Sequence, residues 1–224
     1  MQFDTLTIRR VVGAQSLEDA FVRRVHDTTE RAMEANLPLR ETLARLGRAN
    51  RAHYIYLASA GREELVGYAL NEIYHANVAS RGAVKVNYFC SAFLLREVRR
   101  RYSMYRMLGP MRLAGDERVL MIRTQSPLPM AGFRRLCRAE NFHMYSPLDG
   151  DVPAIVPDVV VNRFGGPELV HRAAYPTRVS PPHEPHDAQT ARLMRLIEPE
   201  RGDALVLIGV ANELLLAHSP NCAN

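Results

Sequence analysis

The sequence predicts a fold of the α+β class, with a mixed, mostly antiparallel central sheet flanked by helices. Two observations lead to this prediction. Residues 53–95 contain three β-rich segments in succession, separated only by short turns. Helical patterns come before and after this group, so strands and helices do not alternate strictly, as they would in a doubly wound fold.

Each element follows from its local pattern. Strands are expected where β-branched and aromatic residues cluster or alternate with polar ones, and helices where apolar residues recur every three or four positions. The expected order is strand 5–12, helices within 16–37 and 37–50, strands 53–61, 64–77 and 83–95, a helix from 104 to 115, strand 117–124, helix 129–142 and strand 153–164.

The expected domain organisation is one main domain with an extension. Residues 1–175 are expected to form the domain. Residues 176–190 are rich in proline and histidine and poor in apolar residues, which is typical of a linker or surface loop. A short helix at 191–197 and a strand-like run at 203–216 follow. We therefore expect 176–224 to be a linker and a C-terminal helix and strand extension that packs on the same domain.

The composition is that of an ordinary globular protein. Of its 224 residues, 47% are hydrophobic and 24% are charged, and the net charge is +5. Three cysteines (Cys90, Cys137 and Cys222) have spacings that predict neither a disulfide framework nor a zinc site. No apolar run approaches the length of a membrane span, and the N-terminus does not have the pattern of a signal peptide. These features predict a cytoplasmic protein without a metal.

The stretch FLLREVRRRYSMYRML, residues 93–108, places three consecutive arginines between a long strand and a helical pattern. Three interpretations are open: a nucleic-acid patch, a solvated turn, or a site for a phosphorylated ligand. A nucleic-acid patch would spread basic and aromatic residues over a face, whereas this cluster is confined to one strand–helix junction. Backbone N–H groups and the helix dipole attract anions at such a junction, and arginines add bidentate phosphate contacts.

At this junction the chain resembles the GNAT superfamily of N-acyltransferases. In that superfamily the fourth strand leads into a loop written Q/R-x-x-G-x-G/A, which opens the next helix and holds the pyrophosphate of coenzyme A. Arg100 fits the first position of this loop, whereas Ser103 and Tyr105 stand in place of the two glycines. The resemblance covers about residues 3–165, because the later order of helix, strand and helix is also kept.

The resemblance implies a set of residues that bind an acyl-coenzyme A co-substrate. The backbone of Phe93, Leu94 and Leu95 would bind the pantetheine arm and polarise the thioester carbonyl. The segment RTQSP (123–127) resembles RTQNP, which is found in a little-characterised GNAT-like group. In that group the asparagine commonly meets the cofactor arm, and Ser126 stands at its position in this chain. The pyrophosphate loop would contribute Arg100, Arg101, Ser103, Met104, Tyr105 and Arg106.

The resemblance also directs attention to four candidate catalytic residues. Glu72 and His75 are candidates for the general base, although each also fits an outward-facing strand residue. Cys137 occupies the position at which many of these enzymes have a tyrosine that protonates the departing thiolate. A thiol with a pKa of ~8.5 can donate a proton, but a structural cysteine on an apolar helix face is the alternative. Tyr145 lies close by and is a second candidate acid.

Three functions remain open from the sequence. The first is transfer of an acetyl or longer acyl group from acyl-coenzyme A directly to a primary amine, through a tetrahedral intermediate. The second takes the acyl group from an acyl carrier protein, whose acidic surface the arginines would meet. The third is a non-catalytic binding module. We expect a small-molecule amine as acceptor and a homodimer as one possible assembly, and we do not expect a nucleic-acid partner.

Overall fold

The computed structural model describes residues 5–12, 18–34, 36–59, 62–99, 115–176, 178–179 and 182–216. The chain divides into two compact units, and each is described below by itself. Unit 1 comprises residues 1–73 and 89–111, and unit 2 comprises residues 74–88 and 112–224. Two long strands, β3 (Arg62–Val78) and β4 (Gly82–Leu94), contribute to both units.

The strands follow one another in the sheet in the order β1-β2-β3-β4-β5-β8-β6, with β7 paired to β8. The pairs β1–β2, β2–β3, β5–β8, β6–β8 and β7–β8 are antiparallel. Helices flank the strands in each unit. The predicted α+β class with a mostly antiparallel sheet is therefore confirmed.

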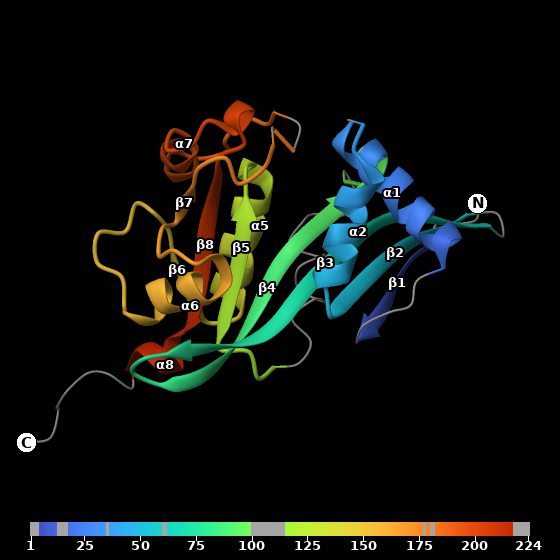
Figure 1. Ribbon diagram of the computed structural model, residues 1–224. Helices are drawn as coiled ribbons and strands as arrows, with labels where there is room; N and C mark the ends of the chain where they lie inside the picture. The colour runs from blue at the N-terminus through green and yellow to red at the C-terminus, as the bar shows by residue number, and fades with distance from the viewer. Residues whose placement is uncertain are drawn as a thin grey trace, which may run out of the picture. The chain divides into compact units, whose positions relative to one another are not determined.

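In unit 1, β1 (Thr5–Val12) is followed by the two helices α1 (Asp19–Met33) and α2 (Leu39–Arg48), and then by β2 (Arg51–Ser59). The two helices lie on one face of these strands (Figure 1). Helix α3 (Arg96–Arg99) begins almost directly after β4. These elements confirm the predicted strands 5–12, 53–61, 64–77 and 83–95 and the two early helices.

The core of unit 1 forms where α1 meets alternate residues of the strands. Ala52, Tyr54 and Tyr56 of β2 share one face because side chains alternate along a strand. Tyr68 of β3 is fully buried, and its hydroxyl lies 2.6 Å from Oγ1 of Thr29 on α1. Because the Thr29 hydroxyl itself donates to a backbone carbonyl of α1, the Tyr68 hydroxyl acts as the donor toward Thr29. This buried bond fixes α1 on the sheet.

Strand β3 contains a β-bulge near its first third. Ile55 pairs with Gly67 and Tyr56 pairs with Leu65, so Val66 is an extra residue without a partner on β2. The carbonyl oxygen of Val66 instead accepts a hydrogen bond of 2.9 Å from the N–H of Leu95, just past the end of β4. Bulges of this kind re-aim a strand and often occur beside active sites.

On the other face of β2 lies His53, an imidazole that is only 2% exposed. Neither ring nitrogen has a hydrogen-bond partner among the described residues. Burial, together with the nearby positive charges of Arg10 and Arg51, lowers the pKa of His53 from 6.5 to about 4. The folded protein therefore holds this side chain neutral, whereas the unfolded chain binds a proton below about pH 6.5.

The difference between the pKa of His53 in the folded and in the unfolded chain predicts that the protein loses stability in acid. His53 contributes stability that is fully present above about pH 6.5 and is lost as the pH falls toward 4, by up to about 3 kcal/mol. Urea unfolding of the wild type and of His53→Leu at pH 7.5, 6, 5 and 4.5 measures this loss as a change in the free energy of unfolding. We expect the wild type to lose stability relative to the variant as the pH falls. Two curves that stay parallel over this range would contradict the prediction.

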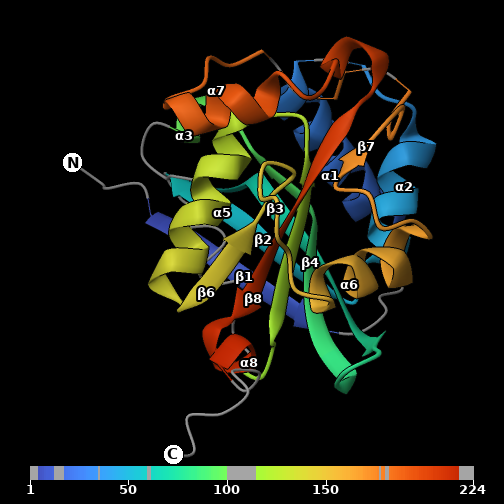
Figure 2. The ribbon, with the colours of Figure 1, turned by 90° about the vertical axis from the view of Figure 1, so that its left-hand side faces the viewer.

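Unit 2 is built around β8 (Ala204–Ala211), in which all eight residues are buried. Strand β8 lies between β5 (Val119–Thr124) and β6 (Phe142–Tyr145), and Figure 2 shows it running through the middle of this unit. Helix α5 (Pro127–Ala139) packs on these strands. The strand-like run predicted at 203–216 thus begins as a strand inside the sheet and ends as helix α8 (Asn212–Leu216). The domain boundary near residue 175 stays a prediction.

Three further elements of unit 2 are short. They are β7 (Val170–His171), α7 (Ala188–Met194) and a 3-10 turn at Pro199–Arg201. Helix α7 is capped by Asp187, whose carboxylate accepts from the backbone N–H of Thr190 at 2.8 Å. It confirms the short helix predicted near residue 191.

The predicted strand at 153–164 is wrong, because this segment forms helix α6 (Ile155–Phe164). Its valines favour strands by propensity, but the buried residues Ile155, Val156, Val159 and Val160 lie at helical spacing and share one face. Gly165 ends the helix with a positive φ of 82°, and its N–H donates to the carbonyl of α6 one turn earlier. Burial of one helix face outweighed local β propensity here.

Candidate active site

The arginine run that raises the question of a phosphate site lies mostly outside the described residues. This applies to Arg100, Arg101, Ser103, Met104, Tyr105 and Arg106, and to the helix predicted from 104 to 115. Phe93, Leu94 and Leu95, which precede the run, and Arg99, its first arginine, are described. The candidate site is therefore built from the end of β4 and the start of α3.

The backbone at the end of β4 is hydrogen-bonded in an ordered way. The N–H of Leu95 donates to Val66 of β3, and the Leu95 carbonyl accepts from the N–H groups of Val98 and Arg99 at 3.0 Å each. The neighbouring Leu94 carbonyl points to the opposite edge of β4, because successive peptide groups alternate along a strand.

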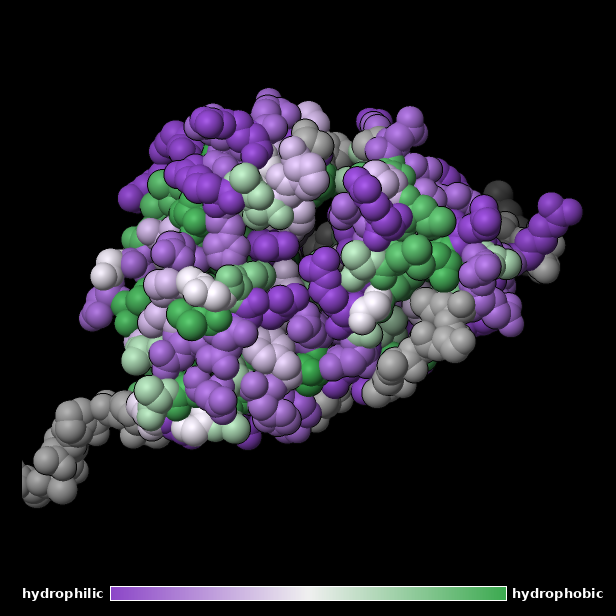
Figure 3. All heavy atoms as spheres, in the orientation of Figure 1, coloured by the Kyte–Doolittle hydropathy of each residue, from purple (hydrophilic) through white to green (hydrophobic). Residues whose placement is uncertain are grey.

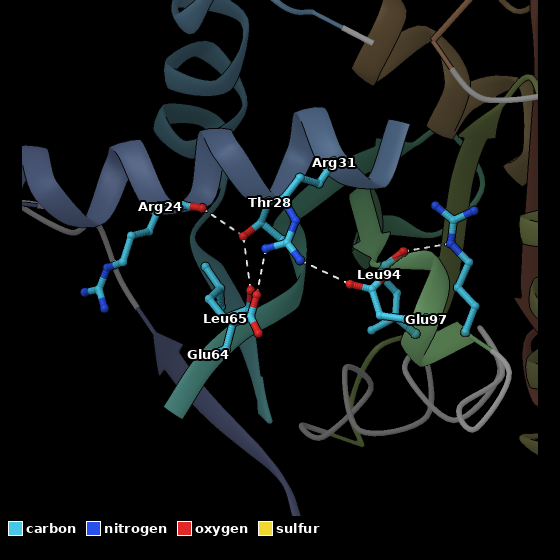
Figure 4. A network of polar contacts seen from close by, with 8 residues as sticks. Arg24, Thr28, Arg31, Glu64, Leu65, Leu94 and Glu97 are labelled. Carbon is cyan, nitrogen blue, oxygen red and sulfur yellow. Dashed lines mark hydrogen bonds and ion pairs between the residues drawn. The ribbon is translucent and has the colours of Figure 1, made fainter. Parts of the chain in front are cut away.

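Arg99 holds the Leu94 carbonyl from this edge. Its Nε donates to the carbonyl oxygen of Leu94 at 2.7 Å, and its NH2 group donates to the carbonyl of Ala32 in the last turn of α1. Figure 4 shows the Leu94 carbonyl with a dashed line for the hydrogen bond that it accepts. A cation is favourable at this place because the last carbonyls of a helix have no partner within the helix. One guanidinium therefore joins the end of α1 to the end of β4.

Burial of the Arg99 guanidinium lowers its pKa, and the negative charges of Glu34 and Glu97 partly offset this effect. An arginine remains protonated under such conditions, so both contacts are charge-assisted hydrogen bonds. We refer to Arg99 and the carbonyls of Leu94 and Ala32 as the Arg99 clamp.

A second, more exposed network lies beside the clamp. Arg31 of α1 donates to Glu64 of β3 at 2.7 Å and to Glu97 of α3 at 3.1 Å, and Figure 4 shows it between the two carboxylates. The hydrogen bond to Glu64 raises the pKa of the Arg31 guanidinium. All three side chains are more than half exposed, so each pair contributes little to stability. Glu97 thus balances local positive charge.

Gly67 allows β3 and β4 to approach closely at the same place. A β-carbon on Gly67 would lie 2.7 Å from the carbonyl oxygen of Phe93 and 2.7 Å from Cδ1 of Leu94. Glycine inside a strand commonly marks such a close approach of two backbones. Gly67 and Arg99 therefore both shape the strand end that the sequence indicates, although nothing in the local pattern singled them out.

The two candidate bases lie three residues apart on β3. Glu72 is half-buried and has interactions with other groups, whereas His75 is exposed. Side chains three positions apart on a strand point to opposite faces. His75 borders an open hollow of about 530 Å³ that is also lined by Arg81, Lys85 and Arg118. The structure therefore does not bring Glu72 and His75 together at one point.

Cys137 lies in the interior of unit 2. It is 1% exposed, and its Sγ would be only 2.7 Å from a β-carbon on Gly209 of β8. Burial raises the pKa of the Cys137 thiol to about 12. A thiol enclosed between α5 and β8 favours the structural alternative for this residue, and the proposed role as an acid stays untested.

Tyr145 ends β6, and its ring lies 4.6 Å from that of His143. Burial and the negative charges of Asp149 and Asp151 raise the pKa of the Tyr145 hydroxyl. Such a hydroxyl stays protonated near neutral pH, as a general acid must before it acts.

The segment RTQSP at the end of β5 has contacts that anchor neighbouring parts of unit 2. The guanidinium of Arg123 lies over the rings of Phe164 and Tyr175, at 5.0 and 4.9 Å. Gln125 accepts from the N–H of Val179 at 2.8 Å and donates to a carbonyl in the 3-10 turn. Ser126 is buried, and its N–H donates to Oγ1 of Thr124 at 3.0 Å. These contacts indicate that Arg123, Thr124 and Gln125 have a structural role.

Within the described residues, no group of three or more His, Cys, Asp or Glu side chains could hold a metal ion. A search of the described helices also finds none that is both long and apolar enough to cross a membrane.

Comparisons with known proteins find similarity at the level of structure. No protein-family model and no curated protein matches the sequence. NAA60 from Arabidopsis thaliana, solved with a bisubstrate analogue, is 10% identical with a TM-score of 0.48, and the match covers 93% of this chain and 100% of that one. A ribosomal-protein alanine N-acetyltransferase from Escherichia coli is 12% identical with a TM-score of 0.45, over 92% and 95% of the two chains.

A spermidine N-acetyltransferase that is a chimera from Vibrio cholerae and hSSAT is 11% identical with a TM-score of 0.43, and the match covers 94% of this chain and 98% of that one. At these identities the likeness is one of fold.

Proposed function

We propose that this protein is a divergent N-acyltransferase of the GNAT type, which transfers an acyl group from a coenzyme A thioester to a primary amine. The observation that carries the proposal is the end of β4. The strand stops at Leu94 and leads almost directly into α3, and the Leu94 carbonyl accepts a hydrogen bond from Arg99. This is the point at which the sequence resembles a strand end that pairs with the pantetheine arm.

The described order of elements supports the same proposal. Strand β1, helices α1 and α2, strands β2, β3, β4 and β5, and helix α5 follow the order that the GNAT resemblance predicts, and the helix expected after the loop lies outside the described residues. Arg100 and Arg101 come directly after α3 in the sequence, where cationic side chains would meet the pyrophosphate of the donor.

In the proposed reaction the protein acts chiefly by positioning. A backbone N–H at the end of β4 would donate to the thioester oxygen, on which negative charge develops as the amine attacks. The amine must lose a proton, and Glu72 and His75 are the proposed candidates for the base. The tetrahedral intermediate then collapses with loss of the thiolate, which Tyr145 is proposed to protonate. The acyl-coenzyme A thioester supplies the activated acyl group.

Calorimetry with coenzyme A and acetyl-coenzyme A tests the proposal. We expect both to bind, and Arg100→Ala combined with Arg101→Ala to weaken binding by about tenfold or more, because two phosphate contacts are lost. Arg96→Ala is the matched control, because Arg96 is a strongly exposed arginine of the same stretch, residues 93–108. Equal effects of the double variant and the control would contradict the assignment of the phosphate contacts.

Holo-acyl carrier protein is the third titrant. If the carrier binds and coenzyme A does not, the acyl carrier protein becomes the proposed acyl donor, and the proposed acyl transfer is kept. Failure of all three titrants would overturn the enzymatic proposal in favour of a binding module. A mass-spectrometric screen of acyl donors against a library of amines then identifies the acceptor.

A further inference from the structure

Arg123 is the one charged residue of strand β5, and it is half-buried. The central carbon of its guanidinium lies 5.0 Å from the ring centre of Phe164 on α6 and 4.9 Å from that of Tyr175. Cation–π contacts with two rings hold the guanidinium in place, but they add no negative charge. Phe164 and Tyr175 are themselves partly exposed, so solvent reaches this group. We refer to Arg123, Phe164 and Tyr175 as the Arg123 cluster.

The charge of Arg123 has no counter-ion in the described part of the chain. Every acidic residue of unit 2 is described, and none of them forms an ion pair with Arg123. Arg178 of the same unit, in contrast, pairs with Glu200 at 2.6 Å. Burial of a charge without a counter-ion is costly, and a ligand of opposite charge would reduce that cost.

The surroundings of the Arg123 cluster are cationic rather than anionic. The guanidinium of Arg163 also lies over the Phe164 ring, at 5.3 Å, although Arg163 interacts with other groups of the protein as well. His171 packs against the same ring, and burial and the positive charge of Arg123 lower the pKa of its imidazole. The charge of Glu168 acts on His171 in the opposite direction with a smaller effect. A surface of this kind attracts anions.

The cluster also has more hydrogen-bond donors than acceptors. Burial lowers the pKa of the Arg123 guanidinium, but the hydroxyls of Tyr175 and Tyr88, which accept hydrogen bonds from it, raise it overall. The guanidinium has five N–H donors, so two hydroxyls do not satisfy it, and its Nε–H has no partner among the described residues. A hydroxyl that accepts keeps its own O–H to donate, and no described residue accepts from that of Tyr175.

We propose that the Arg123 cluster binds the carboxylate group of a small ligand. The guanidinium donates to the carboxylate oxygens, and the Tyr175 O–H donates to one of them. A carboxylate is planar, accepts two parallel hydrogen bonds and carries one negative charge, which matches one guanidinium without a counter-ion. A phosphate dianion would bring two negative charges to this single unpaired cation.

The apolar neighbours of the cluster indicate the body of the ligand. Val161 precedes Phe164 by three residues on α6, so the two side chains lie on the same side of the helix, and Val161 is 44% exposed. Figure 3 shows apolar surface among hydrophilic surface over α6. A flat apolar body can pack against the partly exposed rings and this valine. We therefore expect a preference for small aromatic carboxylates.

The proposal goes beyond the proposed acyl transfer and does not depend on it. The Arg123 cluster belongs to unit 2, and none of its residues is among those proposed to bind coenzyme A or to catalyse the reaction. The test is run without any acyl donor, so that failure of carboxylate binding and failure of donor binding are separate results.

The probe is benzoate, titrated into the full chain at pH 7.5 by calorimetry and by ligand-observed NMR. Benzamide, which has the same shape without the charge, and inorganic phosphate are the comparisons. We expect benzoate to bind about tenfold more tightly than benzamide, because the guanidinium attracts the anion and pairs with both of its oxygens. Inorganic phosphate should bind more weakly than benzoate.

Conservative variants test the contacts. Arg123→Gln should weaken benzoate binding by about tenfold and abolish the preference over benzamide. Arg123→Lys keeps the charge but loses the planar pair of donors, so it should fall between the wild type and Arg123→Gln. Tyr175→Phe keeps the ring and should weaken binding by about threefold. Arg178→Gln is the matched control, because it removes the same charge from an arginine of unit 2 that already pairs with Glu200.

Four results would each overturn the proposal. One is equal binding of benzoate and benzamide. Another is an Arg123→Gln variant, folded by circular dichroism, that binds benzoate as well as Arg178→Gln does. The third is phosphate binding at least as tight as that of benzoate. The last is the absence of saturable benzoate binding by the folded wild type.

Discussion

Gly67→Ala is expected to cause a large loss of both stability and donor binding. The added methyl group would lie 2.7 Å from the Phe93 carbonyl oxygen and 2.7 Å from Cδ1 of Leu94. The leucine side chain can move, but the backbone carbonyl belongs to β4 and shifts only together with the strand. Overpacking of this kind costs about 1–3 kcal/mol.

The functional effect follows from the same displacement. Leu94 and Leu95 are the residues whose backbone we propose to bind the thioester arm, and a shift of the strand end misplaces that backbone. A misplacement of about 1 Å costs up to a hundredfold in rate when positioning is the main source of catalysis. We therefore expect Gly67→Ala to weaken acetyl-coenzyme A binding and to reduce turnover by more than its stability loss alone explains.

Urea unfolding and calorimetry of the same preparation measure the two effects. Gly47→Ala is the control, because no atom lies within 4 Å of an added methyl group there and Gly47 is inside helix α2. Alanine at that position should be neutral or stabilising by up to about 1 kcal/mol. If Gly67→Ala behaved like Gly47→Ala, the close approach of β3 to β4 would contribute nothing to stability or to donor binding.

The Arg99 clamp gives the second large effect. Arg99→Met keeps most of the apolar stem but removes both donors, so the carbonyls of Leu94 and Ala32 lose their charge-assisted partner. Losing hydrogen bonds to a partly buried cation should lower the free energy of unfolding by about 2–4 kcal/mol. Arg99→Lys can satisfy one carbonyl at a time and should fall between the wild type and Arg99→Met.

A role in positioning requires a result that a purely structural role would not give. We expect Arg99→Met to lower kcat more than it raises the KM for the acyl donor, because the thioester still binds but its carbonyl is no longer aligned. Arg99→Lys should restore part of kcat. Arg96→Met is the control, since Arg96 is 75% exposed and makes one long ion pair of 3.5 Å. Loss of stability with kcat unchanged in the folded fraction would reduce Arg99 to a structural residue.

Prediction from sequence succeeded where one periodic pattern dominated a segment. The strands 53–61, 64–77 and 83–95 became β2, β3 and β4, because β-rich segments joined by tight turns have few other ways to satisfy their backbone groups. The pattern failed at 155–164, where adjacent valines favour a strand but a helix buries one face of them. The short strand β6 was not predicted, because four residues are too few to show a clear alternation of apolar and polar positions.

The candidate site was predicted only in part. The end of β4 could be located from the sequence because an apolar strand meets a run of arginines there. The sequence named Arg100 and Arg101 from their match to a loop motif, but it could not single out Arg99, whose carbonyl partners include one 67 residues away on α1. Glu72 and His75 were grouped by their closeness in sequence, whereas alternation along the strand separates them.

By itself the sequence determined the class of fold, the order of most elements and the strand end at which the proposed donor site begins. These depend on local patterns of apolar and polar residues, which act over one element at a time. Only the tertiary structure decided that Arg99 clamps Leu94, that Gly67 makes room for β4 and that Cys137 is enclosed against β8. The physical reason is that each depends on contacts between segments far apart in the chain, and no local pattern encodes them.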